Sequence, residues 1–246
     1  MAILLLFAAT KAGPFLILHS LKKLLLFDID GTLVDSGGGG LQALQLSLAE
    51  HFGIDDDLRY LTLAGATDTQ IARDMLDQNQ LPHTPENITR LIDGYLFHLH
   101  RLLPERSGRV LPGIFALLDS LRTRPHVVLA LLTGNMARGA EIKLSHFGLW
   151  HYFEFGAYAD DHHLRNELGH FARTRAVEKH GIHFPAEAIY VIGDTPRDIA
   201  CGRAVGATTV AVATGSFSTA ELAAHQPDFL FADFTATEAA LDQLGW

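Results

Sequence analysis

Short apolar runs alternate with helical patterns along most of this chain. Apolar residues recur at helical spacing within 114–121, 137–147, 171–180, 199–205, 219–224 and 236–244. Continuous apolar runs that predict buried strands stand between or before them, at 24–27, 127–132, 188–192 and 208–212, with shorter strands at 153–157 and 229–230. Because strands joined by helices pair in parallel, the pattern predicts an α/β fold in three layers, a parallel sheet with helices on both faces.

One stretch, residues 37–110, interrupts this alternation. Its apolar residues recur at helical spacing around 41–52, 71–76 and 88–99 without an intervening strand run. We therefore expect a small helical domain over 37–110, inserted after the first core strand, and a core formed by 22–36 and 111–246. The glycines at 37–40 predict a flexible joint between the two.

Residues 1–21 form an N-terminal extension of uncertain role. Three interpretations stay open, namely a targeting or anchor segment, a start upstream of the true one, and a short strand pair added to the core. The apolar run at 1–10 has no positive side chain before it, and Lys11, Gly13 and Pro14 interrupt it. A targeting or membrane-spanning role is therefore disfavoured, and the other two interpretations are not ranked.

The charge balance excludes some partners. The chain of 246 residues has 19 Lys and Arg against 28 Asp and Glu, a net charge of −9. This argues against binding to nucleic acid or to an anionic membrane surface, both of which require a basic patch. The chain has a single cysteine, Cys201, which excludes an intrachain disulfide and favours a cytoplasmic location. No pattern indicates an oligomeric state.

Polar residues follow three of the predicted strands at the point where each strand ends. Ligands bind beyond the carboxyl ends of parallel strands, so these residues are candidates for one site. Paired carboxylates suit Mg²⁺, and a hydroxyl with free backbone N–H groups at a helix start suits an anion. Each group alone is typical of a turn or a helix cap, but their combination indicates phosphate chemistry with a metal ion. The residues are Asp28 and Asp30, then Thr133, Gly134 and Asn135, then Asp194 and Asp198.

In these segments the chain resembles the haloacid dehalogenase-like hydrolase superfamily. Residues 27–33, 131–135 and 191–199 resemble its first, second and fourth motifs, and the resemblance covers about 22–246. Residues 65–68 are similar to the phosphoglycolate phosphatase-like branch. The resemblance implies a Rossmann-like core in which the helical insert is a cap.

The resemblance also implies a role for each residue. Asp28 would be the nucleophile, and Asp30 would protonate the leaving group and later activate water. Thr133, Gly134 and Asn135 would bind the phosphoryl group. Mg²⁺ would be held by the Asp28 carboxylate, the Asp30 backbone carbonyl and Asp194, with support from Asp198 through water.

The third family motif, usually a lysine, has no lysine at its expected place. Arg165 is the candidate for this catalytic cation, because an arginine can hold a phosphoryl oxygen and carboxylates together. The alternative is that Arg165 is an exposed surface charge. Lys143, on the helix after the second motif, is expected to face solvent. Thr67 and Asp68 either cap a helix or contact the core from the cap, and both interpretations stay open.

These observations favour a Mg²⁺-dependent phosphatase acting on a small phosphorylated metabolite through an aspartyl phosphate, with phosphoglycolate phosphatase as the nearest type. A sugar phosphomutase using the same intermediate is an alternative, as is a catalytically silent binding protein on the same scaffold. A dehalogenase is disfavoured because that branch lacks the second aspartate, which is present here as Asp30.

Overall fold

The computed structural model of the protein describes residues 22–246. The interpretations of residues 1–21 therefore lie outside the described part of the chain. Within that part, none of the helices combines the length and the apolar character that crossing a membrane requires.

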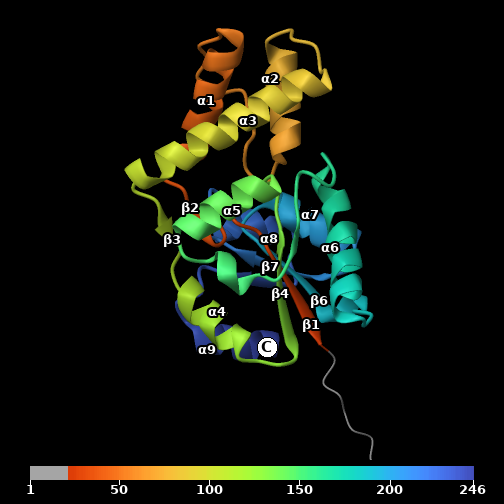
Figure 1. The fold of residues 1–246 in the computed structure, drawn as a ribbon. Coiled ribbons are helices and arrows are strands. Elements are labelled where there is room, and N and C mark those ends of the chain that lie inside the picture. Colours follow the sequence, from red (N-terminus) through yellow and green to blue (C-terminus); the bar gives the residue numbers. More distant parts are fainter. Residues whose placement is uncertain (1–21) are drawn as a thin grey trace, which may run out of the picture.

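A six-stranded parallel sheet forms the centre of the core (Figure 1). The strand order is β5-β4-β1-β6-β7-β8, so the chain builds one side of β1 first and then returns to build the other. Asp28 thus follows a strand at the point where the winding direction changes, which is where open α/β sheets bind ligands. The strands are β1 (Lys23–Phe27), β4 (Val127–Leu132), β5 (Gly156–Ala157), β6 (Ile189–Gly193), β7 (Thr208–Val212) and β8 (Phe229–Phe231).

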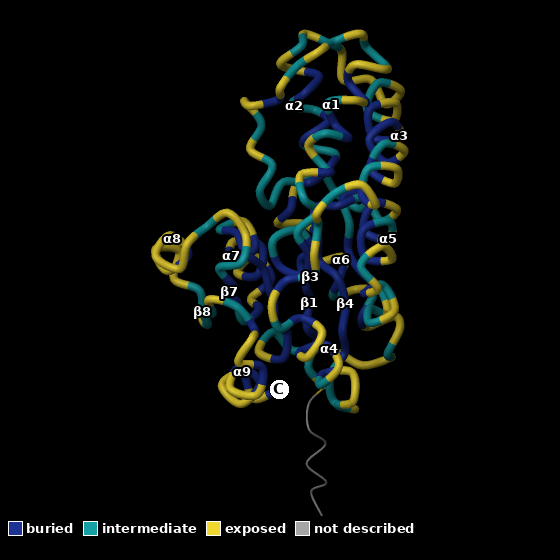
Figure 2. Tube along the Cα trace, turned by 90° about the vertical axis from the view of Figure 1, so that its left-hand side faces the viewer, coloured by how far each residue is buried: buried dark blue, intermediate teal, exposed yellow. Residues whose placement is uncertain are grey.

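Helices cover both faces of the sheet, as the α/β pattern predicts. Alternate residues of β1 point to opposite faces. Leu25 and Phe27 pack with α4, α5 and α9, whereas Leu24 and Leu26 pack with α6 and α7. Figure 2 shows the central strands of the sheet buried and the outer helix faces exposed. The core helices are α4 (Ile114–Arg122), α5 (Ala137–His146), α6 (Arg165–His180), α7 (Pro196–Ala204), α8 (Thr219–Ala224) and α9 (Thr237–Leu244), with 3-10 turns at Trp150–Tyr152 and Ala186–Ala188.

Helix α6 begins six residues before the predicted start at 171. The prediction followed Phe171, whose side chain is partly exposed. The buried stripe consists instead of Leu168, Ala172 and Ala176, which recur every four residues. Small alanines carry a weak hydrophobic signal, and no side chain caps the helix at Leu164, so the sequence marked this boundary poorly.

Three helices inserted between β1 and β4 stand above the carboxyl edge of the sheet (Figure 1). They are α1 (Gly39–Phe52), α2 (Asp68–Gln78) and α3 (Pro85–Leu102), followed by a 3-10 turn at Leu103–Glu105. Their apolar faces form a hydrophobic cluster of their own. The short antiparallel pair β2 (Val34–Asp35) and β3 (Arg109–Val110) holds the two connections to the core together.

The predicted flexible joint at 37–40 is only half as long as expected. Gly37 and Gly38 have the left-handed backbone that favours glycine, with φ of 61° and 78°. Gly39 and Gly40 already belong to α1. The turn into the helix therefore takes two residues, and the helix absorbs the other two.

Candidate active site

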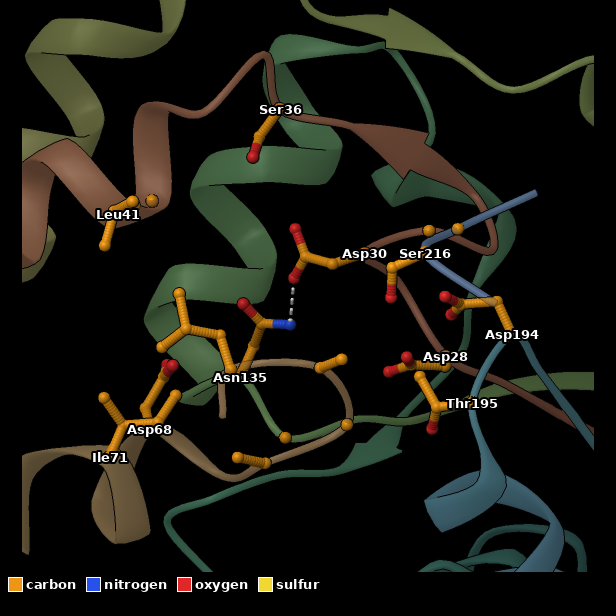
Figure 3. A pocket seen from close by; sticks show the side chains of 18 of the residues that line it. Asp28, Asp30, Ser36, Leu41, Asp68, Ile71, Asn135, Asp194, Thr195 and Ser216 are labelled. Carbon is orange, nitrogen blue, oxygen red and sulfur yellow. Dashed lines mark hydrogen bonds between the residues drawn. The ribbon is translucent and has the colours of Figure 1, made fainter. Parts of the chain in front are cut away.

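The three polar segments predicted to converge do so, because their strands are neighbours in the sheet. Asp28 follows β1, Thr133 follows β4 and Asp194 follows β6. Strand β1 lies between β4 and β6. A cavity of about 310 Å³ opens between this edge and the helical insert. Figure 3 shows Asp28, Asp30, Asn135 and Asp194 around it.

A cluster of three buried carboxylates lies at the floor of the site. Asp28, Asp194 and Asp198 are 4%, 3% and 2% exposed, and one oxygen from each lies within 4.8 Å of the others. Burial and the neighbouring carboxylates raise the pKa of Asp194 to about 8, and burial likewise raises the pKa of Asp28. Carboxylate oxygens are the ligands that hard divalent cations prefer, so the cluster could hold a divalent metal ion.

Two glycines keep the space beside Asp194 free of side chains. A Cβ at Gly31 would lie 2.3 Å from Asp194 Oδ2, and one at Gly215 would lie 1.7 Å from the same oxygen. Gly31 also has a φ of +79°, which disfavours any other residue. Thr32 Oγ1 donates a hydrogen bond of 3.0 Å to Asp194 Oδ1. The two glycines therefore make room for the Asp194 carboxylate itself, and Thr32 holds one of its oxygens.

Arg165 lies inside the site, so the surface-charge interpretation of this residue is wrong. Its side chain is 6% exposed, and Nη2 lies 3.0 Å from Asp28 Oδ1 and also pairs with Asp198. Burial alone would lower the pKa of Arg165, but the two carboxylates raise it. Nε has no hydrogen-bond partner among the described residues, and a Cβ at Gly134 would lie 3.0 Å from Nη1. Arg165 thus holds Asp28 with one nitrogen and approaches the turn after β4 with another.

Asp198 orients its neighbours with both of its oxygens. Oδ2 accepts hydrogen bonds from the backbone N–H of Thr195, at 2.9 Å, and from Thr195 Oγ1, at 2.7 Å. The first of these bonds, together with the bond from Asp198 N to Thr195 Oγ1, forms the capping box that begins α7. Oδ1 pairs with Arg165. Asp198 therefore links Arg165 to the start of α7, with one oxygen bonded to each.

Lys143 does not face solvent, contrary to the prediction from the helical pattern. Its side chain is 5% exposed, and Nζ donates hydrogen bonds to Asp30 Oδ2, at 2.6 Å, and to Asn135 Oδ1, at 2.7 Å. Burial opposes its charge, but Asp30, Tyr95 and Asp68 raise the pKa of Lys143 overall. Lys143 is buried because the face of α5 beside Gly139 packs against the helical insert. A Cβ at Gly139 would lie 3.1 Å from Leu96 of α3.

Asn135 connects these groups. Its Nδ2 donates to Asp30 Oδ2, at 2.9 Å, and to Thr133 Oγ1, at 2.8 Å. The Asp30 side chain is 42% exposed and lies outside the cluster of three carboxylates. One Asp30 oxygen receives the bonds from Lys143 and Asn135, and the other points toward Ser36 and the cavity (Figure 3). This arrangement leaves one oxygen of Asp30 available to a bound molecule.

Asp68 joins the insert to the core, and the two interpretations of residues 67–68 both hold. Thr67 Oγ1 accepts from Gln70 N at 3.1 Å, which caps α2. The N–H of Asp68 donates to the Gly134 carbonyl at 2.7 Å, and Met136 N donates to Asp68 Oδ2 at 2.7 Å. Burial raises the pKa of Asp68 to about 6. The local sequence pattern predicts the N-cap of α2, whereas the contact of Asp68 with the core depends on the fold.

Comparisons with known proteins agree with this geometry. The family of haloacid dehalogenase-like hydrolases matches residues 25–212. A phosphoglycolate phosphatase of Synechococcus elongatus is 31% identical over 84% of this chain and 91% of its own. A probable phosphatase of Dickeya dadantii is 26% identical over 91% of this chain and 95% of its own.

Solved structures show the same fold. A hydrolase from Pseudomonas syringae aligns with a TM-score of 0.70 at 23% identity, over 90% of this chain and 98% of its own. Three strand ends, a buried group of aspartates and a family match over most of the chain thus lead to one assignment. The chain belongs to the haloacid dehalogenase-like hydrolases.

Proposed function

We propose that this protein is a Mg²⁺-dependent phosphatase that hydrolyses a small phosphate monoester through an aspartyl phosphate on Asp28. The observation that carries the proposal is the buried group of Asp28, Asp194 and Asp198 with Arg165 bonded to the first. The relatives named as phosphatases support the same reaction class.

The donor set suits Mg²⁺, which prefers carboxylate and carbonyl oxygens. The carboxylates of Asp28 and Asp194 and the backbone carbonyl of Asp30 would hold it, with Asp198 in support. The ion would offset the repulsion between the Asp28 carboxylate and the phosphate dianion.

The proposed reaction has two steps, formation of the aspartyl phosphate and its hydrolysis. An oxygen of Asp28 bonds to phosphorus while the bond from phosphorus to the leaving oxygen breaks, and Asp30 gives that oxygen a proton. Asp30 then takes a proton from a water molecule, whose oxygen bonds to phosphorus and releases Asp28 and inorganic phosphate. Arg165, Thr133 and the backbone of Gly134 would bind the phosphoryl oxygens. The lack of a hydrogen-bond partner for Arg165 Nε among the described residues supports this role.

The helical segment 37–110 would act as a cap that keeps bulk water out during the reaction. Asp68 would fix the closed position, because it bonds both the Gly134 carbonyl and Met136 N on the turn that binds the phosphoryl group. Lys143 and Asn135 would orient Asp30 for proton transfer.

Release of inorganic phosphate tests the proposal. With Mg²⁺ we expect turnover of p-nitrophenyl phosphate and of several small phosphate monoesters, and loss of that turnover when a chelator removes the ion. Analysis of the organic products separates a phosphatase from a phosphomutase, which would yield an isomeric sugar phosphate without free phosphate. Absence of phosphate release from the whole panel would rule out the proposed function.

Metal binding should depend on pH with a defined sign. The pKa of Asp194, about 8 in the folded protein against 3.8 ordinarily, means that the metal-free fold holds a proton which the unfolded chain releases. The contribution of protonated Asp194 to the free energy of unfolding is therefore fully present below about pH 4 and is lost as the pH rises toward 8. Because Mg²⁺ must displace this proton, we expect the ion to raise the melting temperature more at pH 8 than at pH 6. Calorimetry with and without Mg²⁺ measures both increments, and equal increments would contradict the expectation.

Replacing Lys143 by methionine should lower kcat about 10- to 100-fold, the usual effect of removing a group that orients a catalytic residue. The pH profile of kcat should also change, because Asp30 loses its buried cation. Steady-state kinetics from pH 5 to 9 measures both effects. Arg138→Met removes an exposed cation from the same helix and should leave the profile as it is. An unchanged profile in Lys143→Met would limit Lys143 to a structural role.

A further inference from the structure

The wall of the cavity opposite the strand ends is apolar. The insert contributes Leu41 and Leu44 from α1, Leu63 and Ala66 from the loop before α2, and Ile71 from α2. Figure 3 shows Leu41 and Ile71 on this side, across from Asp28 and Asp194. With the phosphoryl group at the strand ends, the leaving alcohol would lie against this wall.

Within the described part of the chain, each cationic side chain that lines the cavity already has a carboxylate partner. Among the described residues that line it, the cationic side chains are Arg165 and Lys143. Arg165 is bonded to Asp28 and Asp198, and Lys143 to Asp30 and Asn135. A second anionic group would compete with these carboxylates for the same two cations, and breaking a buried pair would leave a carboxylate without its partner.

The charged group that the insert itself presents to the cavity is an acid. Asp68 lines the cavity and is 9% exposed. Tyr95, the other polar side chain from the insert helices, is buried at 3% exposure. A carboxylate or second phosphate on the alcohol would thus be desolvated beside a like charge.

We propose that the substrate's alcohol is small, uncharged and largely apolar, and that esters with a second anionic group are disfavoured. This inference rests on the proposed phosphatase function and adds the substrate class. The proposed substrate class differs from that of the relatives named phosphoglycolate phosphatase, since glycolate carries a carboxylate. Each methylene that enters the apolar wall should raise kcat/KM about fourfold, until the cavity is full.

A matched pair of esters tests the charge. 2-Phosphoglycolate and 2-phosphoglycolamide have the same number of heavy atoms and differ by one negative charge on the alcohol. With the native enzyme and Mg²⁺, we expect kcat/KM for the amide to exceed that for the acid at least tenfold. We also expect kcat/KM to rise from methyl to propyl phosphate. Equal values or a preference for the acid would overturn the inference.

A second test adds a positive charge to the apolar wall of the cavity and measures the ratio of kcat/KM for the amide to that for the acid. Leu41 is 37% exposed, so a polar replacement is compatible with folding. Leu41→Lys should reduce the ratio of amide to acid, whereas Leu41→Met, of similar length and without charge, should keep it. The same ratio in both variants would contradict the charge argument.

Turnover of p-nitrophenyl phosphate distinguishes failure of this inference from failure of the proposed function. If Mg²⁺-dependent turnover of that ester is present and the acid is preferred, only the substrate class is wrong. If that turnover is absent, the phosphatase function fails and the substrate class fails with it.

Discussion

The variant Asp28→Asn is expected to lose phosphate release by about three orders of magnitude or more, the scale of effect seen when a catalytic nucleophile is removed. Asparagine has nearly the same shape, but its amide cannot form the acyl phosphate. Asp28 is 4% exposed and directly follows the central strand, so no other nucleophile can take its position without moving the backbone. Initial rates with Mg²⁺ and p-nitrophenyl phosphate measure the loss.

Asp55→Asn is the matched control, because it makes the same change at an exposed position of the insert. It should retain full activity. Circular dichroism and melting curves of Asp28→Asn should show a folded protein, since the substitution removes a charge from a crowded acidic cluster. Phosphate release in Asp28→Asn at a rate near that of the native protein would show that Asp28 is not the nucleophile.

Arg165→Met is expected to lower kcat about 100- to 1000-fold, the range found when one group that stabilises transition-state charge is removed. The substitution takes away the cation that pairs with both Asp28 and Asp198. It also removes the donor that faces the turn at Gly134. Rates measured across substrate and Mg²⁺ concentrations separate a loss of kcat from a loss of metal affinity.

Two further variants show whether the loss in Arg165→Met comes from the removed guanidinium. Arg165→Lys keeps the charge but cannot reach several acceptors at once, so its activity should lie between those of the native protein and Arg165→Met. Lys179→Met removes an exposed cation from the same helix and should have no effect. Activity of Arg165→Met within twofold of native would assign Arg165 a structural role, with its charge needed only to pair the buried acids.

The positions of Asp28, Thr133 and Asp194 could be predicted because local pattern defines them. Each follows a short apolar run that forms a buried strand, and parallel strands bring their carboxyl ends to one edge. Arg165 was identified by its type and its place before β6, but its burial could not be read locally. That burial depends on Asp28 and Asp198, which lie far from it in the sequence.

Lys143 shows where sequence reasoning stopped. The apolar pattern of α5 passes through Ala140 and Leu144, and a lysine beside such a stripe is usually solvated. Here a second layer, the helical insert, covers that side of the helix, and Asp30, 113 residues away, receives the charge. Contacts between insert and core, including those of Asp68, therefore could not be deduced from helical spacing alone.

Chemical trapping of the aspartyl phosphate tests the central claim most directly. The enzyme is mixed with Mg²⁺ and p-nitrophenyl phosphate, quenched in acid and reduced with borohydride, which converts an acyl phosphate of aspartate to homoserine. Peptide mass spectrometry should find homoserine at position 28, and none when a chelator is present or when residue 28 is asparagine. Homoserine at another aspartate, or none at position 28 while phosphate is released, would contradict a mechanism through Asp28.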